Sequence, residues 1–212
     1  LVFIFGVIIG SFLNVVILRY KTGRNVSGRS FCFSCSKNLS AFELIPLVSF
    51  VFQMGKCKGC KSKVSWQYPL VELLSGLVFL VVFMKIVEVF PFVSVFSLLF
   101  YWFAFSLLIV ISVYDIRHKI VPDMLAFIFA FASLLWLLGT NDIVYFTTYP
   151  GLFNLFAGPL LFLPFFFLWL ISKGEWMGLG DGKLVIGIGW FLGFTQGISA
   201  IILGFWIAAL VS

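Results

Sequence analysis

The sequence predicts an all-α polytopic membrane protein of about seven spans, with a small cysteine-containing insert between its first two helices. Hydrophobic residues make up 62% of the chain and charged residues only 10%. The mean hydropathy is +1.17, which is far above that of a soluble domain. The apolar residues lie in long runs, and all four cysteines lie in one polar segment. Together these observations exclude an ordinary soluble fold.

Seven apolar runs are candidate membrane spans, since a full crossing takes roughly 20 apolar residues. They cover residues 1–18, 69–84, 92–114, 121–138, 151–171, 184–195 and 197–212. The sixth run is short and rich in glycine. The chain begins at Leu1 inside one apolar run and ends at Ser212 inside another. We therefore expect it to be truncated at one or both ends.

The basic residues predict the orientation of these spans. If the spans alternate in direction, residues 19–68, 115–120 and 172–183 share one side of the membrane. These segments hold thirteen of the fourteen lysines and arginines, and only Lys85 falls on the other side. The positive-inside rule makes the shared side cytoplasmic. The net charge of +6 then faces anionic lipid headgroups. We therefore expect membrane lipid as a partner and no binding of nucleic acid.

Residues 19–68 form the only sizeable polar segment, and about 50 residues are too few for a stable apolar core without a staple. The four cysteines form two C-x-x-C pairs, Cys32 with Cys35 and Cys57 with Cys60. This spacing is typical of a zinc ribbon in which four thiolates hold one ion. Disulfides or free thiols are the alternatives, although a reducing cytoplasm disfavours disulfides. Because four sulfur ligands leave no open position, the predicted zinc is structural.

Several polar side chains lie within or beside apolar runs. Asn14 is costly to bury and requires a partner. Glu72 lies near the predicted start of the second span, where it either stabilises the helix dipole or binds a ligand. His118 lies among basic residues, which favours a solvated or lipid-facing position. The apolar stretch 43–50 is suited to resting on the membrane surface.

Two aspartates are the strongest candidates for chemistry. Asp181 lies in the glycine-rich stretch 177–183 between two apolar runs, and Asp115 lies at the end of the third run. The predicted topology places both at the cytoplasmic interface. Gly178 and Gly180 would permit left-handed dihedral angles and a close approach of another chain. One interpretation is a solvated loop. The other is a pair of carboxyl groups that share a proton and act as general base and acid on a peptide bond.

At this point the residues resemble a known family, the type IV prepilin peptidases, which belong to the GxGD aspartic proteases. The matching segments follow one another in the family's order and cover nearly the whole chain. They are residues 10–19, both cysteine pairs, 43–49, 68–72, 115–123 and 178–183. Members of the family are bifunctional enzymes of bacterial inner membranes that remove a prepilin leader and methylate the new N-terminus.

The resemblance implies a role for each matching residue. The catalytic pair would be Asp115 and Asp181, and the supporting or substrate-binding residues would be Gly178, Gly180, Lys183 and Asp123, with Asp123 as a capping or orienting group. The metal ligands would be Cys32, Cys35, Cys57 and Cys60. The candidates for methyl transfer from S-adenosylmethionine would be Asn14, Arg19, Glu43 and Glu72.

It also implies how the chain is organised and what it acts on. Residues 1–18 would form the first transmembrane helix, 19–68 a cytoplasmic zinc-binding segment associated with methyl transfer, and 69–212 the peptidase domain. The substrates would be prepilins or pseudopilins with a short basic leader, cut after a glycine at the cytoplasmic face of the inner membrane. The oligomeric state stays open.

The sequence departs from the family pattern after Arg19, where Lys21, Arg24, Asn25 and Gly28 replace the usual prolines and Glu-Ser pair. This departure weakens the expectation of methyl transfer, so a protease that only cleaves is one alternative. Another departure is Gly182, which replaces an apolar residue. A further alternative is a transporter or assembly scaffold in which the carboxyl groups relay protons.

Overall fold

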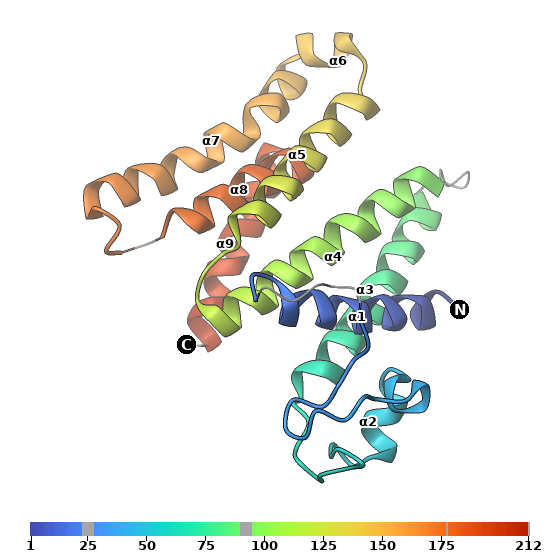
Figure 1. The fold of residues 1–212 in the computed structure, drawn as a ribbon. Coiled ribbons are helices and arrows are strands. Elements are labelled where there is room, and N and C mark those ends of the chain that lie inside the picture. Colours follow the sequence, from blue (N-terminus) through green and yellow to red (C-terminus); the bar gives the residue numbers. More distant parts are fainter. Residues whose placement is uncertain (23–27, 90–94, 177, 212) are drawn as a thin grey trace. The chain divides into compact units, whose positions relative to one another are not determined.

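A computed structural model of the protein describes residues 1–22, 28–89, 95–176 and 178–211 (Figure 1). Nearly all regular structure in these residues is helical, as the sequence predicts. The chain divides into two compact units, Leu1–Val113 and Tyr114–Ser212. In the part of the chain that the structure describes, each of the seven predicted apolar runs overlaps a helix.

In the first unit, α1 (Val2–Arg19) packs along α3 (Gln67–Val89). Small residues at the contact let the two backbones approach closely. A Cβ atom on Gly6 would lie 2.7 Å from Cβ of Phe79, and one on Gly10 would lie 2.8 Å from Cα of Glu72. Gly6 and Gly10 are spaced as in the small-xxx-small motif of membrane helix pairs. Gly10 therefore serves the close packing of α1 against the backbone of α3.

The helix α4 (Val95–His118) belongs to the first unit as far as Val113, and its last turn belongs to the second. Within the first unit, the Trp102 ring stacks on the buried ring of Phe79, with centroids 4.9 Å apart and an interplanar angle of 8°. The Trp102 indole N–H donates to the backbone oxygen of Phe79 at 3.2 Å. A polar group in an apolar environment is thereby satisfied within the chain.

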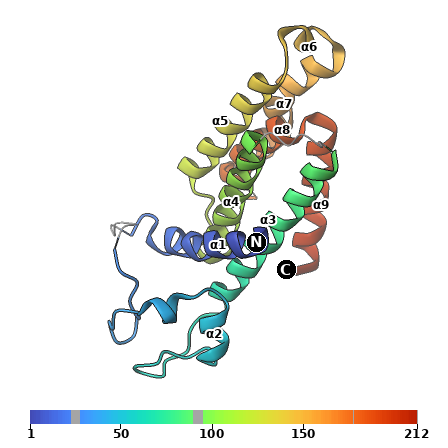
Figure 2. The same ribbon diagram turned by 90° about the vertical axis from the view of Figure 1, so that its right-hand side faces the viewer.

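The segment between α1 and α3 contains η1 (Ala41–Leu44), α2 (Val48–Phe52) and two tight loops that carry the cysteines. Figure 2 shows α2 and its neighbouring loops next to the start of α3. Each cysteine loop is closed by an isolated antiparallel bridge, Phe31 with Asn38 and Lys56 with Lys63. This segment is thus a pair of short hairpins rather than an independent apolar core.

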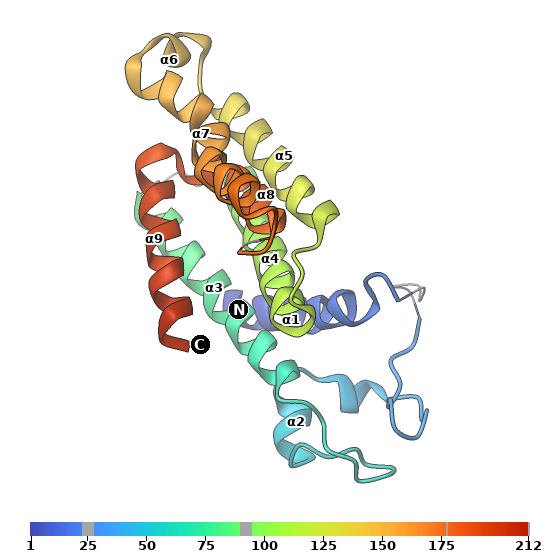
Figure 3. The ribbon, with the colours of Figure 1, turned by 90° about the vertical axis from the view of Figure 1, so that its left-hand side faces the viewer.

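The second unit contains α5 (Asp123–Thr140), α6 (Ile143–Thr147), α7 (Tyr149–Ser172), α8 (Leu179–Leu192) and α9 (Phe194–Val211). The helix α8 packs against both α5 and α7 (Figures 1 and 3). Glycine permits this contact, because a Cβ atom on Gly189 would lie 2.7 Å from the backbone oxygen of Ala157. Phe129 and Ala157 are fully buried at the helix contacts.

Among the described residues, five helices are long and apolar enough to cross a membrane. They are Val2–Arg19, Gln67–Glu88, Val95–His118, Asp123–Thr140 and Tyr149–Ser172. The apolar helix Phe194–Leu210 is shorter, and α8 has only 14 residues. The chain is therefore an integral membrane protein, and the two last predicted spans are helices below the full crossing length.

Replacing Gly10 with leucine should separate α1 from α3, because the new side chain would meet the backbone of Glu72. Overpacking of this kind costs about 1–3 kcal/mol. We expect a lower midpoint of thermal unfolding in detergent. The matched control is Gly204→Leu, since no atom lies within 4 Å of a Cβ at that position. Equal midpoints for the two variants would contradict the close α1–α3 contact.

Candidate functional site

The two candidate carboxyl groups both belong to the second unit. Asp115 lies in the last turn of α4 and is partly buried, and Asp181 lies in the first turn of α8. The helix α4 ends at a left-handed Lys119 with φ 56°, whose N–H donates to the backbone oxygen of Asp115. A short connection then leads to Pro122, which precedes α5. The chain thus brings two helix ends, each carrying an aspartate, into one compact unit.

The glycine-rich stretch begins a helix rather than forming a loop. Gly178 is the N-cap of α8 in an extended conformation, and α8 starts at Leu179. The expected left-handed dihedral angles are wrong, because Gly178 and Gly180 have negative φ values. A Cβ atom on Gly180 would lie 3.0 Å from Cβ of Val121, so glycine permits a close contact within the chain, and the approach of another chain stays a prediction. Met177 lies outside the described residues.

The protonation of Asp181 is shifted by its surroundings. Asp181 precedes the predicted span 184–195 and lies outside the five membrane-length helices. Partial burial raises the pKa of Asp181, and the negative charge of Asp115 raises it further. Burial disfavours the charged form of a carboxyl group, and a nearby like charge has the same effect. Both effects favour the neutral form of Asp181.

The two supporting polar residues bind one another. The Lys183 ammonium group lies 2.7 Å from a carboxylate oxygen of Asp123. Asp123 is in the first turn of α5, where an acid also suits the helix dipole. The same ammonium group lies 5.8 Å from the centroid of the Phe127 ring. This ion pair joins α5 to α8 next to Asp181.

In the first unit, the four cysteine sulfurs lie within 4.8 Å of one another. The sulfurs of Cys32 and Cys60 are 3.9 Å apart. A zinc ion bound tetrahedrally at about 2.3 Å would place its sulfur ligands about 3.8 Å apart. The arrangement is therefore compatible with a structural zinc ion.

The two cysteine loops have the same backbone geometry, which suits thiolate ligands. In each loop the backbone oxygen of the first cysteine accepts a hydrogen bond from the backbone N–H four positions later. These pairs are Cys32 with Ser36 and Cys57 with Lys61, and Ser36 and Lys61 both have positive φ. Backbone N–H groups of Cys35 and Ser34 donate to the Cys32 sulfur and lower the pKa of that thiol to about 6. Since metals bind the thiolate form, this polarity favours metal binding.

The candidates for methyl transfer are engaged within the first unit. Asn14 is buried and donates to the backbone oxygen of Tyr68 at 3.2 Å, which confirms that it needs a partner. Glu72 accepts the backbone N–H of Leu47 at 2.8 Å. Arg19 donates to the backbone oxygen of Arg29. Arg29 follows the segment in which the sequence departs from the family pattern. Two residues of that segment, Arg24 and Asn25, lie outside the described residues.

The fourth candidate, Glu43, closes the end of η1. Its carboxylate accepts the backbone N–H and the hydroxyl of Ser40, each at 2.9 Å, and lies 3.2 Å from the Lys37 ammonium group. The Ser40 N–H, the Ser40 hydroxyl and the Lys37 charge together lower the pKa of Glu43 to about 2. Glu43 is therefore ionised and held by Ser40 and Lys37.

Two features were missed by the sequence reasoning. One is the bond from Leu47 to Glu72, which ties the cysteine segment to α3. The interpretation of Glu72 considered the helix dipole or a ligand, and no sequence pattern pointed to a backbone N–H 25 positions away. The other feature is a pocket beside α2, described below. His118 is exposed, as expected, and its ring lies 4.4 Å from that of Tyr114.

The fold and the site define an integral membrane protein with a tetracysteine cluster and with two helix ends of one compact unit that carry carboxyl groups. Residues 4–86 match the bacterial peptidase A24 N-terminal domain, and residues 102–212 match the type IV leader peptidase family. The chain belongs to the type IV leader peptidase family, which is a family of proteases.

Curated relatives extend this result over the whole chain. A protein of Bacillus subtilis is 32% identical over 216 residues, which cover 100% of this chain and 79% of the relative. A protein of Aeromonas hydrophila is 31% identical, with 92% and 73% covered. A protein of Myxococcus xanthus is 34% identical, with 90% and 55% covered. All three are named prepilin leader peptidase/N-methyltransferase. No solved structure matches the chain.

Replacing Asp181 with asparagine should stabilise the second unit at neutral pH. Because the pKa of Asp181 is raised on folding, the folded state binds more protons than the unfolded state, and stability falls as pH rises above the usual aspartate range. The variant should not lose stability in this way, so its free energy of unfolding should exceed that of the wild type by more as the pH rises. The measurement is the difference between the thermal unfolding midpoints of the variant and the wild type at each pH.

The control for this measurement is Asp142→Asn, which removes an exposed carboxylate after α5. It should follow the wild-type pH profile of the midpoint. A wild-type-like profile for Asp181→Asn would contradict the raised pKa.

Proposed function

We propose that the chain is a membrane aspartic endopeptidase that removes the leader of prepilins or pseudopilins, with Asp115 and Asp181 as its catalytic pair. The observation that carries the proposal is the presence of both aspartates at helix ends of one compact unit, with the charge of one raising the pKa of the other. Membership of a protease family and the names of the relatives support the reaction and the substrate class.

The raised pKa of Asp181 supports its role as the general acid, and the role of general base is then left to Asp115. The Asp115 carboxylate takes a proton from a water molecule, and the oxygen of that water attacks the carbonyl carbon of the scissile peptide bond. The protonated Asp181 donates to the carbonyl oxygen as it gains charge. When the tetrahedral intermediate collapses, the C–N bond breaks and the leaving nitrogen takes the proton that Asp115 carries. The Asp181 proton returns from the hydroxyl, so the pair is regenerated.

The surroundings of the pair favour an extended substrate. Gly178 is exposed, and of the atoms that the structure describes outside its chain neighbours, a Cβ atom there would meet only the backbone nitrogen of Gly180, at 4.0 Å. A substrate backbone needs such access to come within reach of two carboxyl groups. The ion pair of Lys183 with Asp123 fixes α8 against α5. We assign Gly178 and Gly180 to access, and Lys183 and Asp123 to positioning.

The proposed location is the inner membrane of a bacterium, with the pair facing the cytoplasm. The distribution of the basic residues supports this orientation, because the connections that carry Asp115 and Asp181 lie on the lysine- and arginine-rich side. Cleavage on that side would leave the apolar stem of the substrate within the membrane.

The variants Asp115→Asn and Asp181→Asn should each lower the rate of leader cleavage by about 10²–10⁴-fold, because general acid and base catalysis contributes this much. The measurement is cleavage of a prepilin panel by the full chain in lipid vesicles, followed by mass spectrometry. Asp142→Asn is the control and should cleave at the wild-type rate. Cleavage at the wild-type rate by either active-site variant would remove its aspartate from the proposed pair.

We also propose that the first unit supports methylation of the new N-terminus and that its cysteines hold a structural zinc ion. S-adenosylmethionine would supply the methyl group when bound. Among the described residues, the four candidates Asn14, Arg19, Glu43 and Glu72 all bind groups of the chain itself. The proposal of methylation therefore rests on the family and the relatives' names.

Cys57→Ser should lower the zinc content of the purified chain from one ion to a small fraction, because a buried thiolate ligand is lost. Elemental analysis gives this ratio. Mass spectrometry of the cleaved pilin then tests the second activity, and we expect cleavage with reduced methylation. Ser34→Ala, in the same cluster, should keep both the zinc and the methyl group. A wild-type product that is cleaved but never methylated would leave only the protease.

A further inference from the structure

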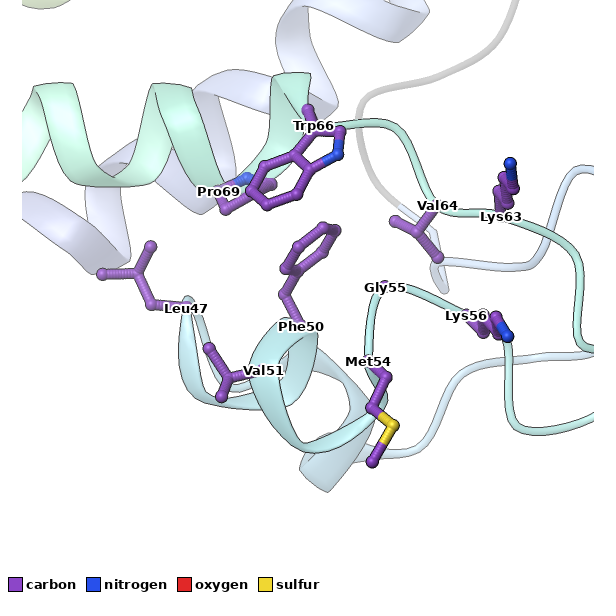
Figure 4. Close-up of a pocket in the computed structure, with 10 residues that line it drawn as sticks. All are labelled: Leu47, Phe50, Val51, Met54, Gly55, Lys56, Lys63, Val64, Trp66 and Pro69. Atoms are coloured by element: carbon purple, nitrogen blue, oxygen red, sulfur yellow. The ribbon is translucent and has the colours of Figure 1, made fainter.

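The first unit contains a pocket of about 590 Å³ between α2, the second cysteine loop and the start of α3 (Figure 4). Its walls are mainly apolar and include Phe50 and Val51 of α2 together with Trp66 and Pro69. Sites for small molecules have volumes of about 300–1,000 Å³ and mostly apolar linings with a few polar groups. None of the proposed catalytic or methyl-transfer residues lines this pocket.

The walls of the pocket are held in place by specific contacts. The rings of Phe50 and Trp66 lie with centroids 5.0 Å apart. Gly55 has φ +65°, and a Cβ atom there would lie 3.1 Å from the Phe50 ring, so glycine allows the loop to close over that ring. Leu47, at the opposite wall, is fixed to α3 through its N–H bond to Glu72. The pocket is therefore formed without a ligand.

Two lysines provide the polar part of the lining. Lys56 and Lys63 are paired in an antiparallel bridge, and Figure 4 shows both at one edge of the pocket. Like charges at directly opposite positions repel, so the pair is stabilised when an anion lies between the ammonium groups. None of the described lining residues is acidic. The charge of the pocket is thus complementary to an anion.

The pocket adjoins a membrane-length helix. Pro69 belongs to α3, whose apolar span starts at Gln67, and Trp66 directly before it is 70% exposed. Tryptophan at the end of a span is typical of the headgroup region. Phe52 and Met54 are more than 80% exposed beside the pocket, and aqueous exposure of such side chains is unfavourable. These positions match an apolar face immersed in the lipid interface.

We propose that this pocket binds an anionic phospholipid, with an acyl chain against Phe50 and Trp66 and the phosphate group between Lys56 and Lys63. The bound lipid would hold the cysteine segment against the membrane surface next to the start of α3. The proposal does not depend on the proposed function, because the pocket contains neither the catalytic aspartates nor the cysteines.

The test uses the full chain in bilayer discs made mainly of phosphatidylcholine with a minority of phosphatidylglycerol. Bromine atoms on the acyl chains of one lipid or the other quench nearby tryptophan fluorescence. The contribution of Trp66 is obtained by subtracting the signal of Trp66→Phe. We expect brominated phosphatidylglycerol to quench this contribution at least about twofold more than its share of the bilayer would give.

The double variant Lys56→Gln/Lys63→Gln should lose this preference. The matched control is Lys58→Gln/Lys61→Gln, which removes the same charge from the same loop at residues that do not line the pocket. It should keep the preference. Native mass spectrometry, which counts the phosphatidylglycerol retained by each variant, gives the same comparison without the Trp66 substitution.

Three outcomes would overturn the lipid site. Quenching in proportion to the bulk lipid would mean that the pocket selects no headgroup. An equal loss in both double variants would reduce the effect to general attraction between a basic segment and the membrane. Displacement of the phosphatidylglycerol by a prepilin peptide, with restored Trp66 fluorescence, would assign the pocket to a protein substrate.

Discussion

The structure depends on one constraint, which is that polar groups in an apolar, membrane-spanning chain must find partners within it. Buried Asn14 binds a backbone oxygen, Glu72 binds a backbone N–H, and Lys183 binds Asp123. Asp181 differs, because the neighbour that most affects its charge, after burial, is another carboxyl group. A like-charge neighbour raises the energy of the ionised form and gives a proton that can be transferred. Asp181, whose neighbour has a like charge, is thus the polar group best suited to proton transfer.

Small residues make the partnerships possible. Gly10 lets the backbone of α1 approach Glu72, and Gly189 lets α8 approach the backbone of α7. Where helices are in such close contact, a polar side chain on one can reach a backbone group near the other. Ser75 marks the limit of this arrangement, since its buried hydroxyl has no hydrogen-bond partner among the described residues. Its small size, rather than its polarity, suits the contact with Gly10.

Patterns local in sequence predicted much of the fold and part of the site. Hydropathy located the helices, and the spacing of Cys32, Cys35, Cys57 and Cys60 predicted a cluster that the structure contains. The role of the glycines around Asp181 was only half predicted, because a glycine-rich stretch is compatible with either a loop or a tightly packed helix start. Gly182 shows the same ambiguity: it is buried, and a Cβ atom there would lie 2.9 Å from the Phe162 ring. Gly182, which departs from the family pattern, thus lies against an aromatic side chain. Sequence spacing alone does not identify such a neighbour.

Contacts between distant segments could not be predicted in this way. The bond from Leu47 to Glu72 requires the chain to turn at Leu47 with a φ of 59°, which side chains with a Cβ atom rarely adopt. Such a conformation persists when surrounding contacts stabilise it, and here a buried carboxylate accepts the N–H that the turn presents. The cysteine segment is therefore held at two places, by its sulfur cluster and by an acid inside α3. Since Glu72 lies within a span, the second attachment couples the position of the segment to the position of that helix. A carboxyl group that sequence reasoning considered for ligand binding has in this structure a positioning role, and any ligand at Glu72 would have to share the carboxylate with Leu47 or displace it.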